Sequence, residues 1–311
     1  MTLFGVLNLN KPAGFTSHDA VDAVRKITRI RRIGHTGTLD PMATGVLPLC
    51  VGNATKIAQF LIAQDKEYEV EMTLGLITDS QDTTGKLVEE RDWRIVSDED
   101  IRRLPEKFTG TQKQVPPMVS AKHHEGKRLY QLAREGIEVE REPIEIQITQ
   151  LEILSMELPR IRFRVLSSKG TYIRTLCHDM GLYLGTGGTM SALVRTRCGA
   201  FHIKDSALLD DLKSPEDVLG HLHTVDNALS SIPAVEIAET ARRRIFQGQP
   251  VLGSHVVGVI GKFEAGGLVR IKTSKDELLA MGKAEISSVH IERLGGGLNV
   301  VKPIRLLAEG R

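Results

Sequence analysis

Residues 66–75, KEYEVEMTLG, restrict the possible folds of this chain more than any other segment. Apolar and polar side chains alternate along it, and a period of two is typical of a β-strand that buries one face. We therefore predict a strand here, in a sheet that packs one face on a core. The apolar face carries Tyr68, Val70, Met72 and Leu74, and the polar face carries Glu67, Glu69, Glu71 and Thr73.

Three more segments in the first part of the chain indicate strands. Residues 3–9, LFGVLNL, and 46–52, VLPLCVG, are short apolar runs that end at proline or glycine, as buried strands do. Residues 160–166, RIRFRVL, alternate in the same way as 66–75. The strands are not separated by helices at regular intervals, so a doubly wound βαβ fold is not indicated.

Helices are predicted between these strands. Thr16 and Asp19 are spaced as a capping box, and apolar residues then recur at helical spacing. Residues 54–64 carry an apolar face of the same period, and Ser97 is placed to cap another helix. Together the segments predict an α+β fold: a mixed, largely antiparallel sheet with flanking helices.

The pattern changes at about Pro233. Short strands punctuated by glycine follow, which predicts a small all-β domain over residues 233–311 after a larger domain over 1–232. Within the larger domain, residues 111–143 are rich in lysine and arginine and predict an excursion from the sheet. The strands expected in the small domain are VVGVIGKF, GGLVRIKT, LLAMGKAEI and GLNVVKPIRLL.

Charge is nearly balanced, with 41 Lys and Arg against 39 Asp and Glu and a net charge of +2. A nucleic-acid surface must therefore come from local clustering. Residues 25–35 hold six basic side chains and no acid, which fits either a solvated helix face or a polyanion site. These side chains are Arg25, Lys26, Arg29, Arg31, Arg32 and His35.

Several classes of protein are excluded by their missing signals. The three cysteines form no C-x-x-C pair, no apolar run reaches the roughly 18 residues of a membrane span, and the N-terminus lacks a basic signal-peptide region. We expect a cytoplasmic protein that does not enter membranes. The P-loop, H-E-x-x-H and G-x-S-x-G motifs are missing from the sequence, and no histidine has acidic or cysteine neighbours at ligand spacing, so neither a metal nor a cofactor is expected.

Residues 34–45, GHTGTLDPMATG, place one carboxylate, Asp40, in a loop with three glycines. One interpretation is a simple turn, because Asp bonds its own backbone and the residue before proline is driven out of helical geometry. The other is a catalytic carboxylate on a rigid loop, with the basic residues just upstream to hold a polyanion. The spacing alone does not decide between them.

The segment GHTGTLDPMATGVLPLCVGNATK resembles the catalytic signature of the TruB family, bacterial tRNA pseudouridine synthases that convert the T-loop uridine to pseudouridine. NKPAGFTSHDAV resembles the family's lysine-proline-glycine motif, and SSKGTYIRTLCHDMGLYLG its arginine-bearing motif. QVPPMVSAKHHEGKRLYQLAREG is similar to the RNA-gripping insertion. The four motifs follow one another in the family's order over roughly residues 4–200.

The resemblance implies three catalytic residues: Asp40 as nucleophile, Tyr68 stacked on the target base, and Arg174 paired with the aspartate. Taken singly, Tyr68 fits a core residue and Arg174 a surface helix residue, so these roles depend on the joint match. The resemblance also implies that Lys11 supports the active-site loop and that Leu193 lines the base pocket. The RNA-binding residues that it implies are His35, Lys11, Arg31, Arg32, Lys122, Lys127, Arg128 and Leu193.

The same resemblance implies a pseudouridine-synthase sheet with a PUA-like RNA-binding domain at the C-terminus, the T arm of tRNA as partner, no cofactor, and a monomer. A purely structural role for the C-terminal domain is an alternative. Two rival functions stay open: a noncatalytic tRNA binder or RNA chaperone, and a carboxylate-dependent nucleoside or glycoside hydrolase. The hydrolase normally needs a second carboxylate, and the sequence marks none beside Asp40.

Overall fold

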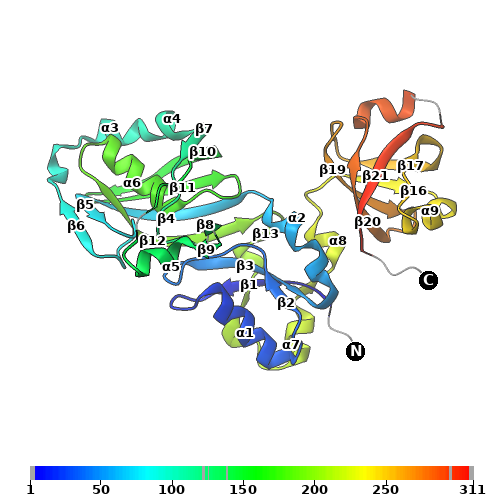
Figure 1. Cartoon of the computed structure of the whole chain (residues 1–311), viewed down its shortest axis with the longest axis horizontal. Coiled ribbons are helices and arrows are strands. Elements are labelled where there is room, and N and C mark those ends of the chain that lie inside the picture. The colour runs from blue at the N-terminus through cyan, green and yellow to red at the C-terminus, as the bar shows by residue number, and fades with distance from the viewer. Residues whose placement is uncertain (1–3, 121–122, 125, 138, 294–295, 308–311) are drawn as a thin grey trace.

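The computed structural model describes residues 4–120, 123–124, 126–137, 139–293 and 296–307. Within these residues the chain forms a large sheet flanked by helices and a separate six-stranded sheet near the C-terminus (Figure 1). The α+β fold class is confirmed. The main path of the large sheet runs β14 (Ala207–Leu208), β1 (Gly5–Lys11), β3 (Thr44–Val51), β12 (Gly188–Cys198), β4 (Lys66–Leu74), β11 (Arg160–Ser167), β10 (Ile144–Glu157) and β7 (Gly110–Gln114).

The large sheet is mixed and largely antiparallel, as predicted. Along that path only the β1–β14 and β3–β12 pairs are parallel. Strand β4 lies in the middle between β12 and β11, and its side chains alternate between buried and half-buried along its whole length. The predicted apolar face of β4 is therefore the core face. Short strands extend the sheet: β2 (Ile33–His35) on β3, β13 (Phe201–His202) on β12 and β15 (Leu222–His223) on β1.

Helix α1 (Ser17–Thr28) begins at the predicted capping box. The Thr16 side chain accepts from the backbone N–H of Asp19, and the Asp19 carboxylate accepts from the N–H of Thr16 at 2.9 Å. The helix ends at Arg29, whose φ of 58° is left-handed and stops the helical turn. Helix α1 lies beside α7 (Pro215–Gly220), and α6 (Ile173–Tyr183) packs on β12 (Figure 1).

Two helix predictions are wrong in detail. Residues 54–64 are not one α-helix: a 3₁₀ segment, Gly52–Ile57, precedes the short α2 (Ala58–Ile62). The Thr55 hydroxyl donates to the Gly52 carbonyl at 3.0 Å, which favours the tighter turn. The helix capped by Ser97 is split into α3 (Asp98–Arg102) and α4 (Leu104–Phe108) because Pro105 has no N–H to continue the ladder.

The excursion predicted over residues 111–143 begins later than expected, because residues 110–114 belong to the sheet as β7. Beyond β7 the described elements are β8 (His123–His124), β9 (Lys127–Arg128) and α5 (Leu129–Arg134), with β8 paired antiparallel to β9. The chain re-enters the sheet at β10. Lys122 lies outside the described residues, and Lys127 and Arg128 are placed here by their backbone alone.

The second sheet confirms the strands expected after Pro233 and adds a short helix, α9 (Arg242–Phe246). It has its own apolar core, built around Val235, Ile271 and Leu279. None of the described helices is both long and apolar enough to cross a membrane. The order of strands is β17 (Val251–Leu252), β21 (Asn299–Leu306), β20 (Leu278–Ala284), β19 (Leu268–Thr273), β16 (Ala234–Ile237) and β18 (Val256–Ile260).

Candidate active site

The loop between β2 and β3, residues 36–43, holds Asp40 and is fastened on both sides of that residue; we call it the Asp40 loop. Before Asp40, the N–H of Leu39 donates to the Ser17 hydroxyl at 2.8 Å. After it, the N–H of Ala43 donates to the Asp40 carbonyl at 3.0 Å, which closes a turn. The turn interpretation is therefore correct for the backbone, and it leaves the carboxylate free to do something else.

Lys11 supports the same loop from below. It is completely buried, and its Nζ donates to the Pro41 carbonyl at 3.3 Å, an oxygen that also accepts from the N–H of Gly14 at 2.8 Å. Further bonds from Nζ reach the carbonyls of Pro12 and Phe15 at 2.9 and 2.6 Å. Burial lowers the pKa of the Lys11 ammonium to about 8, and the carboxylate in the loop opposes that shift. The lysine-proline-glycine motif thus holds the Asp40 loop in place through the hydrogen bonds of Lys11 and Gly14 to Pro41.

Arg195, on β12, fastens the two ends of the Asp40 loop, and sequence reasoning missed it. Its Nε donates to the Val46 carbonyl at 2.6 Å and its Nη2 to the Gly37 carbonyl at 3.2 Å. The backbone of Arg195 also presses on Gly45, where a Cβ would lie 2.3 Å from the Arg195 carbonyl oxygen and φ is 102°. Only glycine fits there. The buried Arg195 therefore requires glycine at position 45.

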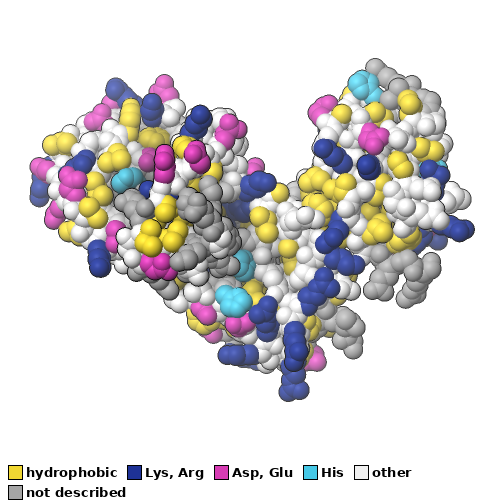
Figure 2. Space-filling model, in the orientation of Figure 1, with side chains coloured by type: hydrophobic (Ala, Val, Ile, Leu, Met, Phe, Trp, Pro, Cys, Tyr) yellow, Lys and Arg dark blue, Asp and Glu magenta, His cyan; other side chains and the backbone are white. Residues whose placement is uncertain are grey.

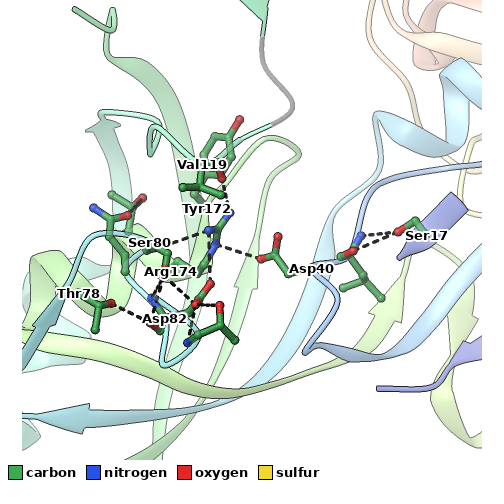
Figure 3. A network of polar contacts seen from close by, with 12 residues as sticks. Ser17, Asp40, Thr78, Ser80, Asp82, Val119, Tyr172 and Arg174 are labelled. Carbon is green, nitrogen blue, oxygen red and sulfur yellow. Dashed lines mark hydrogen bonds and ion pairs between the residues drawn. The ribbon is translucent and has the colours of Figure 1, made fainter. Parts of the chain in front are cut away.

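Asp40 forms an ion pair with Arg174, which lies in the first turn of α6 (Figure 3). The Nε of Arg174 is 3.0 Å from Oδ2 of Asp40. The Arg174 side chain is 7% exposed, and its remaining nitrogens are also engaged. Nη2 donates to the Val119 carbonyl at 2.8 Å, and Nη1 donates to the Ser80 carbonyl at 3.1 Å. The planar fork of the arginine is thus fixed on one side and presents the other to Asp40.

A second carboxylate, Asp82, lies on the far side of Arg174, at 3.4 Å from Nη1. It sits between β5 (Leu76–Thr78) and β6 (Leu87–Glu90), in a segment that the sequence marked only as a polar loop. One of its oxygens accepts from Ser80 Oγ at 2.8 Å and from the N–H and hydroxyl of Thr84 at 3.0 and 2.5 Å. The expectation that Asp40 has no acidic neighbour is wrong, although Asp82 is buried and its acceptors are occupied.

The electrostatic setting of Asp40 is unfavourable to its charge. Burial raises the pKa of the Asp40 carboxyl above its ordinary value, Arg174 opposes the rise, and Asp82 adds to it. Its side chain is nevertheless 32% exposed, so a substrate atom can reach it. The carboxyl therefore reaches solvent, is oriented by Arg174, and shares that arginine's positive charge with Asp82.

Tyr68 lies on the core face of β4, next to this cluster. Burial raises the pKa of the Tyr68 hydroxyl, the adjacent Arg195 guanidinium opposes this, and the charge of Asp40 adds to it. Tyr68 pairs with Arg195 across β4 and β12, and Leu193 pairs with Val70. Because residues two apart on a strand share a face, Leu193, Arg195 and Tyr68 lie on the same side of the sheet. The structure thus brings Asp40 together with Arg174 and near Tyr68, and it places Leu193 on the same face of the sheet as Tyr68.

The basic residues of 25–35 divide into two groups. Arg25 is used internally, since it pairs with Asp22 at 2.9 Å and donates to the Ile33 carbonyl at 2.8 Å. Arg31 and Arg32 are exposed, and Figure 2 shows Lys and Arg side chains in a row over this part of the molecule. Arg32 also donates to Thr55 and Asn53 at 2.6 and 3.1 Å.

His35 is half-buried at the entrance to the Asp40 loop. Its Nδ1 lies 3.4 Å from the N–H of Gly37, in position to accept. Burial lowers the pKa of the His35 imidazole, and Arg195 lowers it further, so both effects favour the neutral ring. A neutral ring offers hydrogen bonds and a stacking face to a nucleotide rather than a charge. Among the described residues, no three His, Cys, Asp or Glu side chains gather as metal ligands.

Three family models match consecutive parts of the chain. Residues 25–173 match the model described as TruB family pseudouridylate synthase, N-terminal domain. Residues 174–229 match tRNA pseudouridylate synthase B C-terminal domain, and residues 233–307 match the PUA domain.

Curated relatives match over nearly the whole chain. One is tRNA pseudouridine synthase B of Clostridium tetani, 42% identical over 290 residues that cover 93% of this chain and 99% of that one. The protein of the same name from Pelotomaculum thermopropionicum is 41% identical and covers 98% and 97%. A solved Cbf5–Nop10–Gar1 complex contains a chain with a TM-score of 0.79 and 31% identity, covering 98% of this chain and 85% of that one.

Proposed function

The chain belongs to the TruB family of pseudouridylate synthases, and from that premise we propose that Asp40 is the nucleophile with which it converts the T-loop uridine of tRNA to pseudouridine. The enzyme is an isomerase. The observation that carries the role of Asp40 is its ion pair with Arg174 at 3.0 Å on a side chain that still reaches solvent. Nucleophiles need this combination of a fixed direction and an open path.

The chemistry asks for a carboxylate and little else. Uridine becomes pseudouridine when the C1′–N1 bond breaks and a bond from C1′ to C5 forms, so the base must be detached, turned over and retained. A carboxylate can hold the ribose or the base covalently in the interval. No hydride, electron or phosphate is transferred, and the residues around Asp40 act as binders and orienters.

Arg174 has a specific part in this scheme. Closing the site over a base removes water from Asp40 and raises the pKa of its carboxyl further. The arginine opposes that rise and fixes the direction of the carboxylate. Arg174 therefore keeps the nucleophile charged and aimed after closure.

The target base has to leave the T loop, which costs a few kcal/mol. Stacking on an aromatic side chain is worth about 1 to 3 kcal/mol per base, so Tyr68 offsets much of that cost. Leu193 supplies an apolar wall beside it. Neutral His35 contacts the nucleotides displaced with the base, and Lys11 holds the loop that carries Asp40.

Basic side chains from two segments of the chain bind phosphates of the T arm. Arg31 and Arg32 lie on the surface before β2, and Lys122, Lys127 and Arg128 come from the segment between β7 and β10. We propose further that the enzyme works in the cytoplasm and as a monomer. Its catalytic domain spans residues 1–232 and its PUA-like RNA-binding domain spans 233–311.

The rival functions fit less well. A hydrolase of the two-carboxylate type needs a second acid with access to substrate, whereas Asp82 is buried and saturated by Ser80, Thr84 and Arg174. A pure RNA binder has no need for a carboxylate facing phosphates. Chaperone activity on tRNA is compatible with the same surface and would persist without Asp40.

The test is to incubate the purified protein with an unmodified tRNA transcript and map pseudouridine along it. Wild type is expected to give product at one T-loop position, and Asp40→Asn none. If both proteins form pseudouridine, Asp40 is not the nucleophile. If neither protein forms it, the proposed function is wrong. Binding and refolding of tRNA by Asp40→Asn reports the chaperone activity separately.

A further inference from the structure

A second charged cluster joins the two domains, and its residues are far in sequence from the candidate catalytic residues. Asp226 lies in the first turn of α8 (Val225–Ala228), beside β1 of the large sheet. Arg270 and Lys272 are on β19 of the C-terminal domain, two residues apart and therefore on one face. Nη1 of Arg270 is 2.6 Å from Oδ1 of Asp226, and Nζ of Lys272 is 2.7 Å from Oδ2. We call these three residues the junction cluster.

Burial of its two cations makes the pairing in the junction cluster costly to lose. The side chains of Arg270 and Lys272 are 6% and 5% exposed. Arg270 also donates from Nε to the Ile232 carbonyl at 2.8 Å, at the point where the chain passes into the C-terminal domain. Buried charges are tolerated only when paired, and salt screens buried pairs weakly. Separating the domains would leave two cations without their shared carboxylate.

The rest of the junction is apolar. Val6, Ile57 and Leu229 of the first domain share one buried cluster with Met281 of the second. Apolar burial is non-directional and tolerates sliding, whereas each oxygen of Asp226 has its own cation at a fixed distance. The apolar contact therefore holds the domains together, and the junction cluster selects one orientation.

That orientation matters for a long RNA. Figure 2 shows Lys and Arg side chains in a row that leads from the lower edge of the large domain toward the junction, with the C-terminal domain beyond. We propose that Asp226, Arg270 and Lys272 are positioning residues that fix the C-terminal domain where it contacts tRNA outside the T arm. The proposal rests on the function proposed above, and it adds that the enzyme binds full-length tRNA through contacts outside the T arm.

The chain offers a matched control. Asp276 also bonds Lys272, but its side chain is 80% exposed and both residues belong to the C-terminal domain. Asp276→Asn removes one negative charge from the same lysine without touching the junction. Asp226→Asn removes the same charge and breaks the ion pairs between the domains. Any difference between the two variants therefore reports the link and not net charge.

The experiment compares two substrates, full-length tRNA and a stem-loop of the T arm alone, which contains the target uridine. For Asp226→Asn we expect KM for tRNA to rise about 10-fold, because a second binding module loses its fixed position. KM for the stem-loop and kcat for both RNAs should stay within about twofold of wild type, and Asp276→Asn should match wild type throughout. Lys272→Gln, which removes one of the two pairs, is the milder variant and should shift the same ratio less.

Small-angle X-ray scattering of the free proteins gives a readout that does not depend on activity. We expect a broader distance distribution for Asp226→Asn than for Asp276→Asn. An unchanged ratio of the two KM values overturns the proposal whatever the scattering shows, and so does an equal loss on both RNAs, since that marks a merely structural role. Wild-type protein that makes no pseudouridine would instead overturn the proposed function.

Discussion

Two ion-pair clusters in this protein have opposite compositions. In the candidate active site one cation, Arg174, lies between two carboxylates, Asp40 and Asp82. At the domain junction one carboxylate, Asp226, lies between Arg270 and Lys272. The junction carboxylate has a cation on each oxygen, whereas Asp40 shares its arginine and has a raised pKa. A carboxylate with a cation on each oxygen stabilises structure, whereas a carboxylate that shares one cation with another acid is available for chemistry.

The same substitution should therefore act in opposite ways at the two sites. Asp40→Asn should reduce pseudouridine formation by about 10⁴-fold or more, as removal of a nucleophile does. Because the folded-state pKa of Asp40 is raised, its contribution to stability is full below the unfolded pKa and is lost as pH rises through the folded pKa, so ionised Asp40 costs free energy above that pH. The Asn variant should be at least as stable as wild type. Asp226→Asn should lose about 3 kcal/mol, because it leaves Arg270 buried without its carboxylate, although Lys272 keeps Asp276. Single-turnover rates and denaturant unfolding of both variants check this.

If Asp40→Asn were destabilised as much as Asp226→Asn, the two clusters would be equivalent and the comparison would fail.

Removing the shared cation is the next largest change. Arg174→Met should lower kcat by about 100-fold, the cost of a misdirected catalytic group, and leave the Kd for tRNA almost unchanged. Arg174→Lys keeps the charge but loses the planar fork, so it should recover only part of the rate. Rapid-quench kinetics and filter binding separate the two quantities. Equal losses in rate and affinity would count against the role of aiming Asp40.

Removing Asp82, the second carboxylate beside Arg174, should show how far it controls the pKa of Asp40. Because Asp82 raises the pKa of Asp40, Asp82→Asn should lower that pKa and move the acid limb of the pH–rate profile to lower pH. The rate at its plateau should fall about 10-fold, since Arg174 loses one of its anchors. Asp79→Asn, an exposed neighbour in the same loop, is the control and should leave the limb in place. An acid limb that moves to higher pH, or that does not move, would show that Asp82 does not raise the pKa of Asp40.

The smallest effect is expected on the surface. Arg31→Gln should weaken tRNA binding about threefold at moderate salt and reduce the slope of log K against log salt by about 1, as loss of one phosphate contact does. Arg25→Gln should leave the slope unchanged, because Arg25 already pairs with Asp22. Binding measured across a salt series decides between them. Equal changes in slope would mean that both arginines contact phosphate.

Local patterns predicted much of the fold. Alternation located β4, and the capping box at Thr16 located the start of α1, because both depend on neighbouring residues. The helix expected over 54–64 was wrong, since a Thr55 hydroxyl bond tightens its first turn. The family resemblance named Asp40 and Arg174, which the structure places in contact.

Residues whose position depends on distant contacts were not predictable. Asp82 meets Arg174 across 92 positions, and Arg195 reaches Val46 in β3 across 149 positions and Gly37 in the Asp40 loop across 158. No local pattern encodes such contacts, and a buried arginine in a strand does not differ in sequence from an exposed one. The exposed residues Arg31 and Arg32 were found as a cluster of like charge, but clustering did not reveal that Arg25 is used internally.

The central claim is that Asp40 meets an extruded uridine. The most direct test is a crystal structure of Asp40→Asn bound to a T-arm stem-loop, in which turnover is prevented. We expect the uridine outside the loop, its ring stacked on Tyr68, and residue 40 within about 3.5 Å of the ribose C1′ or of the base, the range of a near-attack geometry. A uridine still stacked inside the T loop, or a residue 40 side chain turned toward solvent away from it, would contradict the account.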